Sequence, residues 1–125
     1  MNENDLSYKI IGAAIDLHKH IGPGLLESVY ENALAHDLNA LGLTTVQQVP
    51  MPFVYKDVRM NVGYRLDLLV ENRVIVEVKS LEVLAPVHHA QTLTYLKLSG
   101  KKLGLLINFN TKVLKDGVHQ VVHNL

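Results

Sequence analysis

An acid, a second acid and a lysine stand within the two apolar runs of residues 64–79. Asp67, Glu77 and Lys79 lie among leucine, isoleucine and valine residues, which fit two strands joined by a short polar turn. A buried charge is strongly unfavourable unless it is paired or binds a metal ion. Two carboxylates and an ammonium group in such a hairpin therefore predict either a metal-dependent site or a buried network of ion pairs.

The length of the turn decides whether the two carboxylates meet. With a three-residue turn over residues 71–73, Asp67 lies opposite Glu77, with Cβ atoms roughly 4.5–5.5 Å apart. Lys79 shares a face with Glu77, because side chains alternate along a strand. A two-residue turn would shift the register by one and send the carboxylates to opposite faces.

Two helices are expected before this hairpin. The first runs from about Asp5 to His20, with apolar side chains at helical spacing, and Gly22-Pro23-Gly24 ends it in a tight turn. The second runs from about Leu26 to Leu41. Its apolar stripe, which we expect to be buried, consists of Leu26, Val29, Tyr30, Ala33, Leu34, Leu38 and Leu41.

The remaining segments predict further strands and a third helix. Two extended segments, a helix and a buried strand are expected, in this order, over residues 44–55, 58–69, 86–99 and 103–109. Pro50 and Pro52 place the first of them at a sheet edge. Residues 113–122 are expected to form a hairpin over Asp116-Gly117. This order predicts an α/β fold of the α+β type, a mixed and mainly antiparallel sheet flanked by helices.

Composition indicates one globular domain over residues 1–125, with 48% hydrophobic and 19% charged residues. The chain has 12 basic and 12 acidic residues, which argues against binding duplex through a broad basic surface but leaves room for a local strip. The absence of cysteine excludes disulfides and thiolate zinc sites. With an acidic N-terminus and no apolar run near ~20 residues, we expect a cytoplasmic protein outside the membrane.

Seven histidines raise the question of a zinc site. His18 and His20 diverge on a helix, as do the adjacent His88 and His89, and no two histidines on a predicted helix have the four-residue spacing of a zinc site. Surface or helix-capping histidines are therefore expected. His88, one turn before Gln91, is the histidine expected nearest to the charged hairpin.

The order of an acid, Glu-x-Lys and a helix resembles the PD-(D/E)XK nuclease superfamily. The signature here is Asp67 followed by Glu77-Val78-Lys79, with Leu66 in place of the proline. Gln91 and Tyr95 on the next helix are similar to the Gln-x-x-x-Tyr signature of exonuclease-like branches. The resemblance implies a restriction-endonuclease-like core with a central mixed sheet.

A closer resemblance, to the small bacterial and archaeal GxxExxY proteins, covers nearly the whole chain. Residues 24–30 match that motif without a mismatch and follow the usual Gly22-Pro23. The similarity continues through residues 64–70, 76–79, 86–88, 90–91, 95–96 and 104–109. The chain departs from the family at Asn110, where glycine is expected, and at His119-Gln120, which replaces a more basic pair. The second departure weakens the expectation of a cationic contact to nucleic acid there.

The resemblance implies a Mg²⁺- or Mn²⁺-dependent site. Asp67 and Glu77 are the implied metal ligands, with the Val78 carbonyl and Glu27 as further ligands. Lys79 would position the attacking water and stabilise charge in the transition state. Gln91 would orient the lysine or a phosphate. The implied substrate-binding side chains are those of Tyr95, Gln91 and His88.

Structural alternatives exist for single residues and for the whole chain. Glu27 also suits the first turn of a helix as a surface acid, and Tyr30 fits the core. The protein is either a nuclease acting on DNA or RNA, or a catalytically silent module that keeps the fold and binds nucleic acid or protein. A homodimer or a protein partner could complete a substrate channel. A basic strip beside the carboxylates would favour the nuclease and scattered cations the module; the residues concerned are Lys56, Arg59, Arg65, Lys97, Lys101 and Lys102.

Overall fold

The computed structural model describes the backbone of residues 1–125 and every side chain except that of Val62. Its elements are α1 (Glu3–Ile21), α2 (Glu27–Ala40), β1 (Thr45–Tyr55), β2 (Val58–Val70), β3 (Val74–Lys79), α3 (Pro86–Ser99), β4 (Leu103–Asn108), the 3₁₀ helix η1 (Leu114–Gly117) and β5 (Val118–Val122). The strands form one five-stranded sheet in the order β1-β2-β3-β4-β5. Neighbours are antiparallel except for β3 and β4, which run parallel. No helix in the described part of the chain is long and apolar enough to cross a bilayer.

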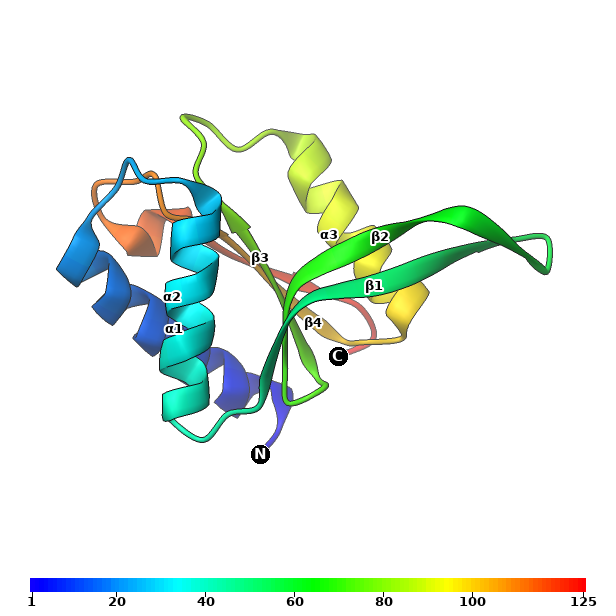
Figure 1. Cartoon of the computed structure of the whole chain (residues 1–125), viewed down its shortest axis with the longest axis horizontal. Helices are drawn as coiled ribbons and strands as arrows, with labels where there is room; N and C mark the ends of the chain where they lie inside the picture. The colour runs from blue at the N-terminus through cyan, green and yellow to red at the C-terminus, as the bar shows by residue number, and fades with distance from the viewer.

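Helices cover both faces of this sheet, α1 and α2 on one and α3 on the other (Figure 1). An apolar cluster lies beneath the helices on each face. The larger cluster joins α1, α2 and η1 to β3 and β4, and the smaller joins α3 to the β1–β2 side. Tyr30 of α2 is fully buried and stacks on Phe109 with ring centroids 4.5 Å apart, which confirms it as a core residue. The predicted mixed sheet flanked by helices is thus confirmed.

The predicted burial of the apolar stripe of α2 is confirmed only for residues in the middle of the helix. Tyr30, Leu34 and Leu38 are buried. Leu26 and Leu41 are 74% and 63% exposed, because they flank the helix as its N-cap and C-cap residues and do not lie on its inner face. Val29 is also exposed, at 42%. The prediction of these three as core residues is wrong.

The β2–β3 turn has the predicted three-residue length. Val70 pairs with Val74 across residues 71–73, and the pairing continues inward from there. Continued by one residue pair past Leu68 and Val76, this register sets Asp67 opposite Glu77. The predicted register is therefore confirmed.

Beyond their pairing beside β3, β1 and β2 project together as a long two-stranded arm, residues 49–66 (Figure 1). β1 is an edge strand, as its two prolines predicted. Its pairing with β2 is interrupted at Gln48, which has a φ of +53° and no partner although its neighbours on both sides are paired. The register is the same on both sides of Gln48 and shifts between Pro52 and Val54, closer to the tip of the arm.

The hairpin predicted for residues 113–122 is wrong. Its first half is the 3₁₀ helix η1, and its second half, β5, pairs with β4. Leu114 is buried in the larger cluster. Gly117 packs so closely on Asn108 that a Cβ atom there would overlap the Asn108 carbonyl oxygen. The Asp-Gly pair thus turns the chain against the end of β4 and does not link two strands of a hairpin.

Candidate metal centre

The carboxyl groups of Asp67 and Glu77 lie where β2 and β3 separate. Backbone pairing between these strands ends at Leu68 and Val76, while β3 continues beside β4. Beyond that point the Asp67 N–H donates to Glu77 Oε2 at 2.9 Å. The Val78 N–H donates to Asp67 Oδ2 at 2.8 Å. Each strand therefore uses a carboxylate of the other in place of a ladder bond.

Burial of this pair makes both carboxyl groups harder to ionise. Glu77 is 4% exposed, and burial together with the nearby Asp67 charge raises its pKa to about 8. Burial also raises the pKa of Asp67, against the opposing effect of its hydrogen bond from Val78. Two acids in this state are stabilised either by keeping a proton or by taking up a cation.

Lys79 compensates these charges only in part. It ends β3, is half-buried, and its positive charge acts to lower the pKa of both Asp67 and Glu77. Among the described side chains it forms no salt bridge within 4.0 Å of either carboxylate. The ammonium group thus stands near the pair without neutralising it.

Glu31 of α2 is a third acid near the pair, and the sequence interpretation missed it. It is 9% exposed, and its charge acts to raise the pKa of Asp67 and of Glu77. Its Oε2 accepts from Gln47 Nε2 at 3.0 Å and its Oε1 from Gln48 Nε2 at 2.8 Å. Glu31 therefore holds β1 where its ladder with β2 is interrupted, beside Asp67. The available signal was its four-residue spacing from Glu27 on one helix.

Glu27 is exposed and braces the end of β3. Its Oε2 accepts from the Ser80 N–H at 3.2 Å, and Ser80 Oγ donates to the Leu25 carbonyl at 2.7 Å. The Tyr30 hydroxyl donates to the Gly22 carbonyl at 2.6 Å and accepts from the Leu25 N–H at 3.1 Å. These contacts tie the loop before α2 to the residue that follows Lys79.

Tyr95 of α3 lies near the carboxylates, on the face of the sheet opposite to the one that α2 covers. It is 5% exposed, and burial followed by the charges of Glu77 and Asp67 raises its pKa to about 12. A hydrogen bond with Gln91, one turn earlier, acts in the opposite direction. The structure thus brings Tyr95 near the carboxylates, with Gln91 beside it on α3.

The histidines hold structural positions. His88 Nδ1 accepts from the Ala85 N–H at 2.9 Å and so caps α3, as predicted. His18 is 7% exposed, and its Nε2 bonds the Thr111 carbonyl at 2.8 Å. The expectation of only surface or capping histidines is therefore wrong for His18, which joins α1 to the segment before η1.

The oxygen donors in the gap where β2 separates from β3 fit a hard divalent cation. The described residues contain no group of three or more His, Asp or Glu side chains arranged to hold a metal. They offer Oδ1 of Asp67 and Oε1 of Glu77, which carry no hydrogen bond among the described residues. The Val78 N–H points into the gap, so its carbonyl faces the same side. Mg²⁺ takes one or two carboxylates and fills its other positions with water and substrate phosphate.

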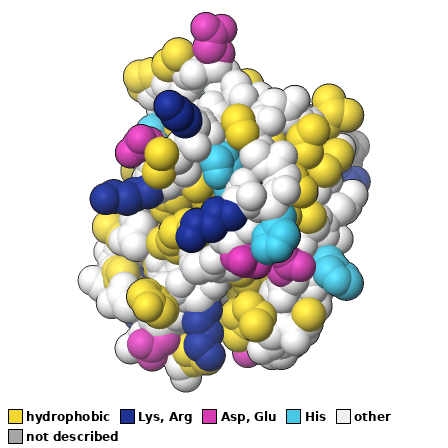
Figure 2. Space-filling model, turned by 90° about the vertical axis from the view of Figure 1, so that its left-hand side faces the viewer, with side chains coloured by type: hydrophobic (Ala, Val, Ile, Leu, Met, Phe, Trp, Pro, Cys, Tyr) yellow, Lys and Arg dark blue, Asp and Glu magenta, His cyan; other side chains and the backbone are white. Residues whose placement is uncertain are grey.

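The basic residues do not form one strip beside the carboxylates. Lys101 donates to Asn72 Oδ1 at the β2–β3 turn, at the other end of β3, and Lys102 follows it. Arg59 and Arg65 lie on the arm. On the face in Figure 2, basic, acidic and histidine side chains are interspersed. The scattered arrangement, which favours a binding module, is the one observed.

A mixed sheet with an acid and a Glu-x-Lys motif at the separation of two strands defines a restriction-endonuclease-like fold. The chain belongs to the PD-(D/E)XK nuclease superfamily, whose sequence model matches residues 4–121. The crystal structure of SSO0001 is similar, with a TM-score of 0.56 and 17% identity over 79% of this chain and 51% of that chain. The chain thus spans about half the length of SSO0001, and the likeness concerns the fold. No curated protein matches the chain.

Proposed function

We propose that the protein is a nuclease that hydrolyses phosphodiester bonds of DNA or RNA with Mg²⁺ or Mn²⁺. The carboxylate pair in the gap between β2 and β3 is the observation that supports this most. Membership of a nuclease superfamily that is typically metal-dependent supports a nucleic-acid substrate. We also propose that residues 24–30 place the chain in the GxxExxY branch.

Four groups are proposed to hold the metal. Asp67 and Glu77 would bind it through the oxygens that are not bonded to strand amides. The Val78 carbonyl and the second carboxylate oxygen of Glu27 are the further proposed ligands. A bound ion would activate water and neutralise charge on the phosphate oxygens.

Four side chains are proposed to act on the substrate and the attacking water. Lys79 would orient this water and stabilise the negative charge that develops on the phosphate. Gln91 would orient Lys79 or a phosphate oxygen. Tyr95, whose pKa of about 12 keeps it protonated, would donate a hydrogen bond to the substrate from the α3 side. His88 would contact substrate from the start of the same helix.

Cleavage of a labelled panel tests this proposal. Single-stranded and duplex DNA and RNA are incubated with wild type, Asp67→Asn and Glu77→Gln, in Mg²⁺, Mn²⁺ or chelator. Glu71→Gln, at the turn at the opposite end of β3, is the control. Metal-dependent cleavage by wild type and the control, lost in both variants, is expected. Cleavage that survives in the variants, or no cleavage of any substrate, would contradict the proposal.

A catalytically silent binding module is the second candidate. The scattered basic side chains favour it, as does the lack of a cluster of three metal-binding side chains among the described residues. Such a module would bind nucleic acid or a protein partner, or form a homodimer, without any metal-dependent cleavage. Binding by wild type that persists unchanged in Asp67→Asn, with no cleavage under any condition, would establish it.

A further inference from the structure

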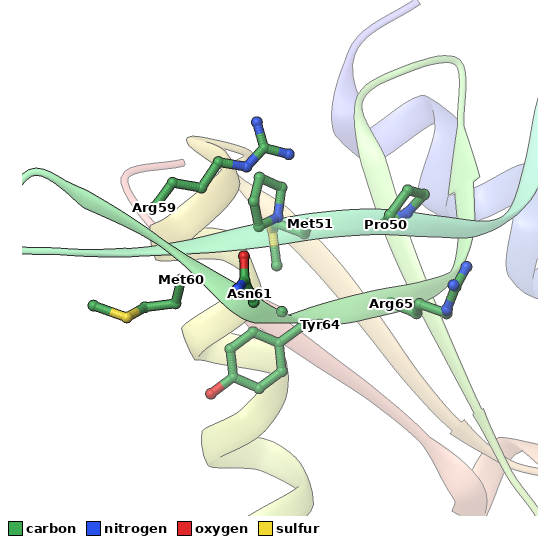
Figure 3. A pocket seen from close by; sticks show the side chains of 9 residues that line it. Pro50, Met51, Arg59, Met60, Asn61, Tyr64 and Arg65 are labelled. Carbon is green, nitrogen blue, oxygen red and sulfur yellow. The ribbon is translucent and has the colours of Figure 1, made fainter.

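The arm carries a hollow of about 340 Å³ (Figure 3). It is lined by Pro50, Met51, Pro52, Arg59, Met60, Asn61, Gly63, Tyr64 and Arg65. Gly63 pairs with Pro52 in the middle of it, and a Cβ atom at Gly63 would lie 2.7 Å from the Met51 carbonyl oxygen. Backbone atoms of β1 thus fill the place that a side chain at Gly63 would take, and glycine allows this close approach of the two strands beside the hollow.

The six basic residues that could have formed a strip are scattered over the molecule as a whole, but three of them lie on the arm. Among residues 49–66 the basic residues are Lys56, Arg59 and Arg65 and the acid is Asp57, so the arm carries a net charge of 3 − 1 = +2. Arg59 and Arg65 are exposed, and within the described part of the chain neither forms a salt bridge or a side-chain hydrogen bond. Their guanidinium groups are free to bind an anion.

The two arginines form a line that leads away from the carboxylate pair. Arg65 stands two residues before Asp67 on β2, about 7 Å along the strand. Arg59 stands six residues farther out, at most about 20 Å along it. In Figure 3, Arg59 and Asn61 rise from one side of the hairpin, whereas Tyr64 points to the opposite side. The arginines therefore border the hollow at its two ends.

We propose that this face of the arm binds the phosphodiester backbone of the nucleic-acid strand that enters the site. Arg65 and Arg59 would each bind a phosphate, a group that matches the fork of a guanidinium. The apolar floor at Pro50 and Pro52 would contact the sugar or base between those phosphates. The inference rests on the nuclease function proposed above and adds a substrate-binding surface outside the metal centre.

Oligonucleotide binding in chelator, where no cleavage interferes, tests this surface. Affinities of fluorescein-labelled single-stranded and duplex DNA are measured from 50 to 200 mM salt for wild type, Arg59→Ala/Arg65→Ala and Lys112→Ala/Lys115→Ala. The second double variant removes the same charge from exposed residues, Lys112 just before η1 and Lys115 within it. Arg59→Lys/Arg65→Lys keeps the charge, and thermal unfolding confirms that each variant is folded.

The arm variant is expected to bind at least about tenfold more weakly than wild type. Its plot of log K against log salt should be shallower by about 1.4 with single strands or about 1.8 with duplex, whichever is the ligand, since two phosphate contacts are lost. The Lys112→Ala/Lys115→Ala control should keep the wild-type salt slope. The Arg59→Lys/Arg65→Lys variant should keep most of that slope. Equal losses in the two alanine variants, no loss in the arm variant, or no binding by wild type would overturn the inference. Binding of poly-glutamate as tight as that of the oligonucleotides would indicate that the arm binds an acidic protein, and would also overturn the inference.

Metal-dependent cleavage separates this inference from the function on which it rests. Normal cleavage by a folded arm variant with unchanged oligonucleotide affinity would overturn the arm surface and leave the nuclease intact. Arm-dependent binding by a wild type that never cleaves would contradict the nuclease and support the surface.

Discussion

Both ends of β3 are buried, but one end is paired with strands on both sides and the other has carboxyl groups on one side. Val74–Val76 pair with β2 on one side and β4 on the other, and all three are 0% exposed. At the other end only the pairing with β4 remains, and carboxyl groups fill the side that β2 has left. Burial therefore stabilises the fold at the first end and perturbs ionisable groups at the second.

The perturbed end is held in place by hydrogen bonds from several elements. Glu31 fixes β1 at Gln48, whose left-handed backbone conformation is unfavourable for a residue other than glycine, asparagine or aspartate. Glu27 fixes Ser80 just after the strand ends. Left-handed residues also occur at the paired end of β3, at Glu71 and Asn72, so the buried like charges are what distinguish the carboxylate end, and such charges are typical of functional sites.

The largest expected effect is on cleavage. Asp67→Asn should lower metal-dependent phosphodiester hydrolysis by at least about 10³-fold, because a group that acts at the reacting centre is removed. Single-turnover cleavage rates at saturating Mn²⁺ provide the measurement. A loss below tenfold would place Asp67 outside the reacting centre and remove the functional contrast between the two ends of β3.

The paired end should dominate stability. Leu68→Ala, at a fully buried residue in the last β2–β3 pair, is expected to lower the free energy of unfolding by about 2–5 kcal/mol. Urea denaturation measures this change. Val46→Ala on β1, where the side chain is 52% exposed, is the control and should change stability by less than about 0.5 kcal/mol. Similar values for the two variants would show that pairing here does not carry the fold.

The carboxylate end should destabilise the metal-free fold as pH rises. The folded pKa of Glu77 is about 8 against an ordinary value of 4.5, so the folded state binds more protons than the unfolded state between these values. Stability should therefore decrease from pH 5 to pH 8. Glu77→Gln should be more stable than wild type at pH 8 by about 1–3 kcal/mol, and its profile should be flatter. Denaturation in chelator across this range tests both points, and a wild-type stability that increases toward pH 8 would contradict them.

The smallest expected effect concerns the acid on α2. Glu31→Gln removes a negative charge near the pair, so the titration midpoint of Glu77 should fall below about 8. Carbon-13 NMR of the Glu77 carboxyl group follows this directly. Glu27→Gln is the matched control, since the charge of Glu27 acts on the pKa of Asp67 and, unlike that of Glu31, is not among the charges that raise the pKa of Glu77. An unchanged midpoint in Glu31→Gln would separate that residue from the carboxylate pair.

The central hairpin could be predicted because its register depends on local rules. The period of two along each strand and the length of one turn were enough to set Asp67 opposite Glu77. The edge position of β1 followed from the missing N–H groups of Pro50 and Pro52. These features need no knowledge of the rest of the fold.

The parts that could not be predicted depend on contacts distant in sequence. Glu31 matters because β1 interrupts its ladder at Gln48, and no local pattern announces that break. Gly117 was interpreted as a hairpin residue because its close approach to Asn108 is a tertiary feature. The strand separation that opens the gap arises in the same way, from β2 leaving with β1 while β3 stays with β4.

Calorimetric titration of Mn²⁺ into the protein tests the central claim most directly. Performed at pH 7 in two buffers of different ionisation enthalpy, it gives both the affinity and the number of protons released. We predict binding that displaces close to one proton, because Glu77 is largely protonated at this pH, and loss of binding in Asp67→Asn/Glu77→Gln. No binding at millimolar Mn²⁺ by folded wild type, or equal binding by the double variant, would contradict the account.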